Sequence, residues 1–295
     1  MPNNSFSLSR RSLGQWALGA SLTPWAALAA MAPAPRFSVM AWALGRDLSF
    51  ESKLDVIRRA GYQGIELTGE FHNWSKTETR EASQRIKDHG LVVDAMAGVR
   101  TGFAQLAQTP QFLTDLSTVI ESAKDFGCRR IILVSGAMSK GIDPADQQAR
   151  IALVLQKAAE LAAEAGMQIV IEPIDGFENP SAFLTGARQA KDILRLVDKP
   201  NVKILFDIFH EQRAYGNVLE TLGLLINDIG LIHIADSPQR GAPGTGELNF
   251  QSIYSELFRL NYQDWIAMEF YHQVDPVAPL TLARQQAMEM MRVAH

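Results

Sequence analysis

The sequence predicts an α/β protein that folds as a single (β/α)8 TIM barrel. Short runs of branched and aromatic apolar residues alternate eight times with longer stretches whose apolar residues recur at helical spacing. No stretch rich in Pro, Gly or Ser divides this pattern, and a chain of 295 residues is long enough for one barrel. An open doubly wound sheet is the rival fold, but no G-x-G-x-x-G turn follows the first strand.

The first four strand–helix units occupy the amino-terminal half of the barrel. The expected strands are 37–44, 64–67, 91–98 and 130–135, and the expected helices are 50–61, 76–89, 110–127 and 143–166. Leu54, Ile57 and Ala60 give the first of these helices an apolar stripe, and Gly90 and Gly166 end the second and fourth. This half therefore supplies four parallel strands with their covering helices.

Four further units complete the barrel. The strands are 168–172 (QIVIE), 203–207 (KILFD), 231–235 (LIHIA) and 266–270 (IAMEF), with helices near 182–196, 217–229, 251–260 and 280–293. Each strand is almost wholly apolar, as expected of parallel strands that are covered on both faces. Because the crossovers are right-handed, all eight carboxyl ends meet at one end of the barrel, where barrel enzymes have their active sites.

One acidic or imidazole side chain lies at or near the end of each of these last four strands. They are Glu172, Asp207, His233 and Glu269. Alternation along each strand places them on the same face as neighbours such as Leu231, so all four are expected to point into the barrel. Three carboxylates and one imidazole suit Mn²⁺, Mg²⁺ or Co²⁺, with Zn²⁺ or Fe²⁺ as alternatives, and leave positions open for a substrate. The competing interpretation is a set of water-exposed residues at strand ends.

Several short motifs resemble the hydroxypyruvate isomerase family of the xylose isomerase-like TIM barrels. In the second half they are EPIDGF, FDIFHEQ, HIADSPQR, GTGELNF and the terminal MEFY, in that order, and GYQGIEL near the start is similar to the second strand of that superfamily. The resemblance covers residues 37–293. At the third ligand position the family commonly has Gln, whereas this chain has His233, which is usual in the related ketose 3-epimerases.

The resemblance implies a role for each of the residues that match these motifs. It implies metal binding by Glu172, Asp207, His233 and Glu269, with the two glutamates also serving as the catalytic acid/base pair. It further implies that His210, in the D-x-x-H pattern after Asp207, hydrogen-bonds a substrate oxygen. Loop capping or packing is the alternative role for this histidine.

The same residue types indicate proton transfer next to a carbonyl group in a small hydroxy-carbonyl or sugar substrate. A C–H bond between carbonyl and hydroxyl carbons becomes acidic when their oxygens bind a divalent cation, and the enediolate that forms is stabilised. One carboxylate removes the proton and a carboxylic acid returns it. Return to the neighbouring carbon is aldose–ketose isomerisation and return to the same carbon is epimerisation; both remain open. Arg240 is expected to hold a substrate carboxylate or hydroxyl, and a solvated loop arginine is the alternative.

Two other function classes are weighed against the isomerase. Trinuclear-zinc endonucleases for abasic DNA share the barrel, but GIELTG, AMAG and GTGELNF lack the further His and Asp ligands, and a net charge of -4 argues against a nucleic-acid partner. A non-catalytic periplasmic sugar-binding protein would not require two carboxylates on a metal. Glu66, near the end of the second strand, is expected to form a structural ion pair. The oligomeric state is open, and a homo-oligomer is compatible with the sequence.

Residues 1–30 are predicted to form a twin-arginine signal peptide ahead of a barrel domain at 37–295. Arg10 and Arg11 precede a weakly apolar stretch, and Ala27-Leu28-Ala29 supplies small residues for cleavage near Ala29 or Ala30. Gly, Gln, Ser and Pro interrupt the apolar stretch, so no stable membrane span is expected once it is processed. The expected location is the periplasm, or the cytoplasm if the segment is not a working signal.

Overall fold

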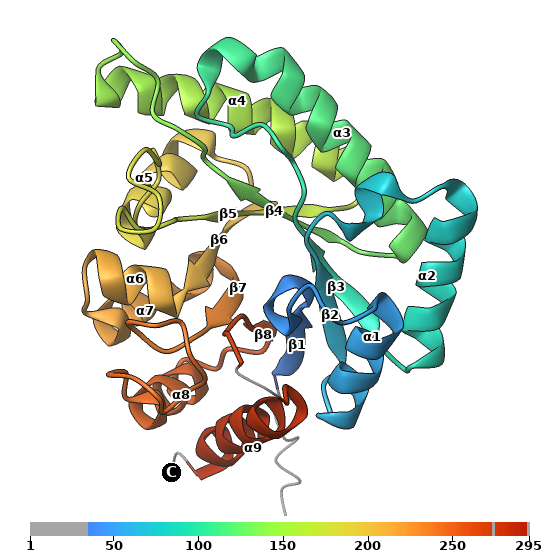
Figure 1. The fold of residues 1–295 in the computed structure, drawn as a ribbon. Coiled ribbons are helices and arrows are strands. Elements are labelled where there is room, and N and C mark those ends of the chain that lie inside the picture. Colours follow the sequence, from blue (N-terminus) through green and yellow to red (C-terminus); the bar gives the residue numbers. More distant parts are fainter. Residues whose placement is uncertain (1–34, 273–274, 294–295) are drawn as a thin grey trace, which may run out of the picture. The chain divides into compact units, whose positions relative to one another are not determined.

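The computed structural model describes residues 35–272 and 275–293, so the predicted signal peptide lies outside the described residues. Within them, eight parallel strands form a closed barrel in chain order, with β1 beside β8 (Figure 1). The strands are β1 (Arg36–Met40), β2 (Gly64–Leu67), β3 (Val92–Met96), β4 (Arg130–Val134), β5 (Gln168–Glu172), β6 (Val202–Asp207), β7 (Ile229–Ile234) and β8 (Trp265–Met268). The predicted (β/α)8 fold is confirmed.

Helices surround the barrel (Figure 1). The α-helices are α1 (Phe50–Arg59), α2 (Lys76–Asp88), α3 (Thr109–Phe126), α4 (Pro144–Glu164), α5 (Ala187–Val197), α6 (Ile208–Ala214), α7 (Val218–Leu225), α8 (Phe250–Arg259) and α9 (Val277–Val293). Short 3-10 helices are η1 (Ala41–Leu44), η2 (Glu70–Asn73), η3 (Leu106–Gln108) and η4 (Ile226–Asp228). None of the helices in the described part of the chain is both long enough and apolar enough to cross a bilayer.

Helix ends follow local capping chemistry. Ser75 and Glu78 form a reciprocal capping box at the start of α2, and Asp143 accepts two backbone N–H groups at the start of α4, where Pro144 follows. Helix α3 ends at Gly127, whose φ of 66° is the left-handed conformation that favours glycine. These residues explain why the predicted helix limits in the first half agree with the structure to within a few residues.

Several elements differ from the prediction on the side of the barrel that carries the site. The last strand ends at Met268 rather than at residue 270, so Glu269 lies directly after β8. The first strand ends at Met40, and 41–44 form the 3-10 helix η1. Helix α5 starts at residue 187 rather than 182 because the preceding residues form a long loop. An unpredicted helix, α6, follows β6 directly because the Asp207 side chain caps it by accepting the N–H groups of Phe209 and His210.

The apolar residues form two layers, one on each face of the strands. The inner cluster fills the barrel with Met40, Ala95, Ile132, Val170, Leu205, Leu231, Trp265 and Ala267. The outer cluster lies between strands and helices and includes Ile171, Phe206, Ile232 and Ile266. The inner cluster contains the residues two positions before Glu172, Asp207, His233 and Glu269, so the predicted alternation is confirmed and these four polar residues belong to the inward face.

The amino-terminal end of the barrel is closed by a polar layer. Arg130, 9% exposed, donates through Nη2 to both carboxylate oxygens of Asp264 at 2.9 Å, and through Nε to Gln168. Above it, the Ser38 hydroxyl donates to Asp94 Oδ2 at 2.8 Å. Partnered polar groups at this end hold the strands together, while the opposite end carries the candidate site.

Candidate active site and metal centre

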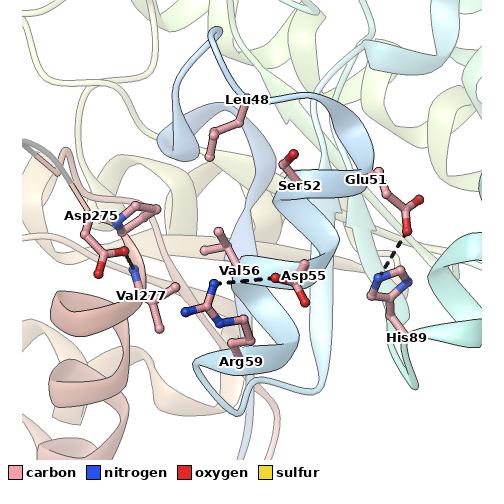
Figure 2. Close-up of a pocket in the computed structure, with 10 residues that line it drawn as sticks. Leu48, Glu51, Ser52, Asp55, Val56, Arg59, His89, Asp275 and Val277 are labelled. Atoms are coloured by element: carbon pink, nitrogen blue, oxygen red, sulfur yellow. Dashed lines mark hydrogen bonds and ion pairs between the residues drawn. The ribbon is translucent and has the colours of Figure 1, made fainter.

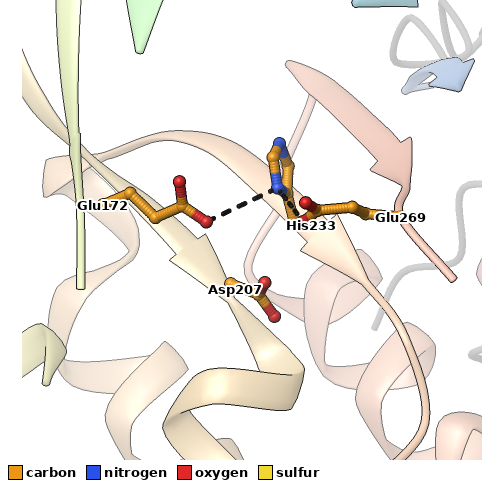
Figure 3. Close-up of side chains that lie close together, drawn as sticks. All are labelled: Glu172, Asp207, His233 and Glu269. Atoms are coloured by element: carbon orange, nitrogen blue, oxygen red, sulfur yellow. Dashed lines mark hydrogen bonds and ion pairs between the residues drawn. The ribbon is translucent and has the colours of Figure 1, made fainter. Parts of the chain in front are cut away.

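The four strand-end residues converge at one point (Figure 3). One ligand atom from each of Glu172, Asp207, His233 and Glu269 lies within 4.8 Å of the other three, and all four residues are buried. Ligand atoms on opposite sides of a Mg²⁺ or Ca²⁺ ion lie about 4–5 Å apart. The spacing, the burial and the donor set of three carboxylates and one imidazole therefore fit a divalent cation.

Strand register accounts for this convergence. Asp207 on β6 is paired directly with His233 on β7, and His233 is paired with Ala267 on β8, two residues before Glu269. Glu172 ends β5 beside Val134 of β4. Because the strands are parallel and nearly in step, residues at their carboxyl ends come to the same height above the apolar inner cluster.

His233 uses its two ring nitrogens differently. Its Nδ1 lies 2.7 Å from Glu269 Oε2 and 3.9 Å from Glu172 Oε1, and so faces the cluster. Its Nε2 lies 3.1 Å from Oε2 of Glu66 on β2. Burial alone would lower the pKa of His233, but the carboxylates of Glu66 and Glu269 outweigh burial and raise the pKa well above its usual value. The predicted ion pair of Glu66 therefore exists, and its partner belongs to the site.

The two glutamates have opposite ionisation tendencies. Burial, reinforced by the negative charge of Glu269, raises the pKa of Glu172 to about 7. Burial would raise the pKa of Glu269 too, but Arg240 and His233 outweigh it and hold that pKa well below its usual range. Two carboxyl groups whose environments separate their pKa values suit one proton-carrying residue and one that stays ionised.

Asp207 joins the site to helix α6. Its Oδ1 accepts the N–H groups of Phe209 and His210 at 2.8 and 3.2 Å, which holds the carboxylate in place. Its Oδ2 remains directed toward the other functional groups, 3.4 Å from Arg240 Nη2 and 3.6 Å from His210 Nε2. The helix cap thus orients one predicted metal ligand.

His210 is buried beside the cluster, and Asp175 orients its ring. The Nδ1 atom lies 2.7 Å from Asp175 Oδ2, and Nε2 has no hydrogen-bond partner among the described residues. Burial would lower the pKa of His210, but Asp207 and Glu172 outweigh it and raise the pKa. The predicted hydrogen bond to a substrate oxygen requires an unpartnered ring nitrogen beside Asp207, and Nε2 is one. Substrate binding by His210 stays a prediction.

Arg240 is buried, so its alternative role as a solvated loop arginine is wrong. Its Nη1 donates to Glu178 Oε1 at 2.9 Å, and its Nη2 lies 2.8 Å from Glu269 Oε2. The guanidinium lies over the rings of Trp42 and Phe209, at 5.3 and 5.0 Å from their centroids. Its charged group therefore contacts two predicted metal ligands, Glu269 and Asp207, and is already neutralised by carboxylates.

Three residues at the site were not predicted: Trp42, Asp175 and Glu178. The Trp42 Nε1–H group donates to Glu269 Oε1 at 3.0 Å, from the 3-10 helix that the sequence placed in a strand. Glu178 lies in the loop after β5, six residues beyond Glu172, and Asp175 lies in the same loop. The position of that loop after a ligand-bearing strand was a usable clue, but its contacts depend on side chains from other loops.

Asp175, Glu178 and His210 form a second group of close metal-binding residue types. Arg213 Nη1 lies 3.7 Å from Asp175 and 3.6 Å from Glu178, and Arg240 contacts Glu178 as well. Arginines already neutralise these carboxylates, which favours a polar rim to the first cluster over a second cation site.

A surface groove of about 630 Å³ lies elsewhere, between α1, the end of α2 and the start of α9 (Figure 2). It is lined by Leu48, Glu51, Ser52, Asp55, Val56, Arg59, His89, Asp275, Pro276 and Val277. Two of its acidic residues contact basic ones, Asp55 with Arg59 at 3.6 Å and Glu51 with His89 at 3.4 Å. The groove contains none of the residues predicted for the active site.

Comparison with known proteins places this barrel among its relatives. The chain is 28% identical over 249 residues to hydroxypyruvate isomerase from Escherichia coli (strain K12), covering 83% of this chain and 96% of that protein. It is 26% identical over 240 residues to 2-oxo-tetronate isomerase from Pectobacterium atrosepticum, covering 80% and 92%. An AP endonuclease of family 2 from Brucella melitensis has the same fold, with a TM-score of 0.78 at 21% identity over 85% of this chain and 98% of that one. Residues 54–293 match the sequence family described as xylose isomerase-like TIM barrel. With the closed barrel, this match shows that the chain belongs to the xylose isomerase-like TIM barrel family.

Proposed function

We propose that the protein is a metal-dependent isomerase that interconverts a small hydroxyketone and its aldehyde isomer, in the manner of a hydroxypyruvate isomerase. The observation that carries the proposal is the pairing of Glu172 and Glu269. Glu172 ends β5 and Glu269 directly follows β8, three strands further around the barrel, and both share one buried cluster with Asp207 and His233. Two carboxyl groups that approach from different strands can serve the two sides of a flat intermediate.

A divalent cation bound to the cluster supplies electrostatic stabilisation of the negative charge that develops on the substrate oxygens. The protein's own groups then handle protons and orientation. Glu172 and Glu269 are the two carboxyl groups placed to exchange a proton with a substrate carbon. His210 presents Nε2 to a substrate oxygen, and Trp42 and Arg240 hold the Glu269 carboxylate in a fixed orientation.

The named relatives support a short hydroxy-2-oxo acid as substrate, because both hydroxypyruvate and 2-oxo-tetronate belong to that class. A ketose 3-epimerase is the second candidate, favoured by His233 at the third ligand position. Arg240 and Arg213 also favour a neutral sugar, since both already contact carboxylates near the cluster. A periplasmic sugar-binding protein without catalysis is the alternative from another class.

Proton exchange in D₂O distinguishes these candidates. Protein treated with EDTA and reloaded with Mn²⁺ is incubated with hydroxypyruvate, 2-oxo-tetronate and a panel of ketoses and aldoses. Deuterium on the neighbouring carbon together with an aldehyde product indicates isomerisation, whereas deuterium on the original carbon with a new diastereomer indicates epimerisation. Binding without any exchange would point to the sugar-binding alternative and overturn the enzyme proposal.

Matched variants test the catalytic pair. Glu172→Gln and Glu269→Gln keep the size of each side chain and remove its proton chemistry, so each is expected to abolish turnover. Glu164→Gln, an exposed glutamate at the end of α4, is the control and should retain full activity. Activity in both active-site variants would remove the two glutamates from the mechanism.

We propose further that residues 1–30 direct export of the protein to the periplasm. The support is the sequence alone, with Arg10 and Arg11 ahead of a weakly apolar stretch. Replacing both arginines by lysine is expected to leave the protein in the cytoplasmic fraction with its full chain length. An unchanged distribution between cytoplasm and periplasm would exclude the twin-arginine route.

A further inference from the structure

Glu66 is a fully buried carboxylate inside the barrel that the proposed mechanism does not use. It lies on β2 and is 0% exposed, and its Oε2 atom lies 3.1 Å from His233 Nε2. Neither of its carboxylate oxygens, nor His233 Nε2, makes a hydrogen bond among the described residues, so this close contact is an ion pair. Burying a carboxylate with a single polar neighbour costs desolvation free energy, so Glu66 is expected to lower the stability of the fold.

A neighbouring buried carboxylate on the next strand has a different partner. Asp94 on β3 is also buried in the barrel, but the Ser38 hydroxyl donates to it at 2.8 Å. One oxygen of Asp94 therefore has a partner of its own, while its Oδ1 has none among the described residues. Glu66 is left facing the imidazole, whose other nitrogen, Nδ1, faces Glu172 and Glu269.

We propose that Glu66 is the positioning residue of the metal centre and acts through His233. With a cation bound, its carboxylate would keep the imidazole proton on Nε2, which would leave the Nδ1 lone pair free to bind the cation held by Glu172, Asp207 and Glu269. A carboxylate behind a ligating histidine holds the ring orientation and makes the ligating nitrogen a stronger donor. This inference rests on the proposed metal-dependent function, because it describes how one of its ligands is prepared.

The proposal separates Glu66 from a merely structural ion pair. A structural pair would stabilise the fold without changing how strongly the cluster binds a cation. A positioning residue changes cation affinity, and loss of such a partner lowers affinity by about 10- to 100-fold. The loss of cation affinity must also disappear when the His233 imidazole is absent, because Glu66 acts only through that ring.

The test measures Mn²⁺ affinity directly, by competition with a fluorescent chelator at pH 8, without reference to turnover. Glu66→Gln keeps the shape of the side chain and is expected to raise the Mn²⁺ dissociation constant by about 10- to 100-fold. The matched control is Glu164→Gln, the same change at an exposed glutamate at the end of α4, which should leave the dissociation constant within about twofold. A Glu66→Gln constant within twofold of wild type would overturn the proposal.

A double-mutant cycle with His233→Gln tests whether the effect passes through the imidazole. In the His233→Gln background, Glu66→Gln is expected to change Mn²⁺ affinity by less than about twofold. An equal loss in both backgrounds would show that Glu66 acts on the site by some other route. If the wild-type protein itself fails to bind Mn²⁺, the proposed function fails, and this outcome is distinct from wild-type binding that Glu66→Gln leaves unchanged.

A spectroscopic measurement on the wild-type protein removes any dependence on how the variants fold. Long-range ¹H–¹⁵N correlation spectra of protein loaded with Zn²⁺ are expected to show the His233 proton on Nε2. Protonated Nδ1, or a metal bound through Nε2, would overturn the assignment of Glu66.

Discussion

Replacing Glu172 by glutamine should abolish turnover and at the same time stabilise the protein when no metal is bound. Burial and the neighbouring Glu269 raise the pKa of Glu172 from 4.5 to about 7. A pKa that is higher in the folded state means that folding favours the protonated acid. Stability from this group is therefore fully present below the unfolded-state pKa and is lost as the pH rises through about 7.

The size of this effect follows from the pKa shift. A shift from 4.5 to about 7 corresponds to roughly 3 kcal/mol of folding free energy at pH 8. Glutamine resembles the protonated acid and does not ionise. The EDTA-treated Glu172→Gln protein should therefore be more stable than wild type by up to about 3 kcal/mol at pH 8, with a smaller difference at pH 6 and almost none at pH 4.

Urea unfolding of EDTA-treated proteins at pH 4, 6 and 8 measures this difference, alongside an activity assay of the Mn²⁺-loaded proteins. Glu164→Gln, an exposed change on α4, should match the wild-type stability at every pH. Equal or lower stability of Glu172→Gln at pH 8, or a difference that does not vary with pH, would refute the reasoning about the buried carboxylate.

Three further outcomes follow from the same contacts. EDTA should abolish activity, and Mn²⁺ should restore it. Mn²⁺ should also raise the melting temperature more at pH 8 than at pH 5, because Glu172 gives up a proton to bind a cation. Equal increases in melting temperature at the two pH values would contradict this. Trp42→Phe removes the N–H group that donates a hydrogen bond to Glu269, and should lower kcat/KM about tenfold or more. The melting temperature should be nearly unchanged. Steady-state kinetics and thermal unfolding measure the two effects. Arg130→Gln breaks the partly buried pair with Asp264 at the far end of the barrel. Calorimetry should show a loss of about 1–3 kcal/mol of stability, while kcat and KM stay within about twofold of wild type.

The barrel and the inward direction of the four strand-end residues could be predicted because they depend on local patterns. Strand runs and helical periodicity identify the eight units, and alternation within runs such as LIHIA places His233 on the inward face. Parallel connection then brings strand ends together without further information. The convergence of Glu172, Asp207, His233 and Glu269 within 4.8 Å agrees with this reasoning.

Local patterns also misled at the edges of the site. The apolar run 37–44 has the composition of a strand throughout, yet the chain turns into a 3-10 helix after Met40 and directs Trp42 at Glu269. Helix α6 does not follow from the apolar pattern, because it depends on Asp207, a predicted ligand whose Oδ1 also caps the helix. A residue with two roles is identified from the sequence by only one of them.

By itself the sequence determined the fold class, the barrel end that carries the site and the chemical types gathered there, because each follows from residue order along single strands. Only the tertiary structure decided the partners: Glu66 behind His233, Trp42 on Glu269, and Arg240 among three carboxylates. Each of these contacts joins residues at least 29 positions apart, and they form at distances of about 3 Å that depend on strand stagger and side-chain rotamers. No periodicity along the chain encodes strand stagger or side-chain rotamers.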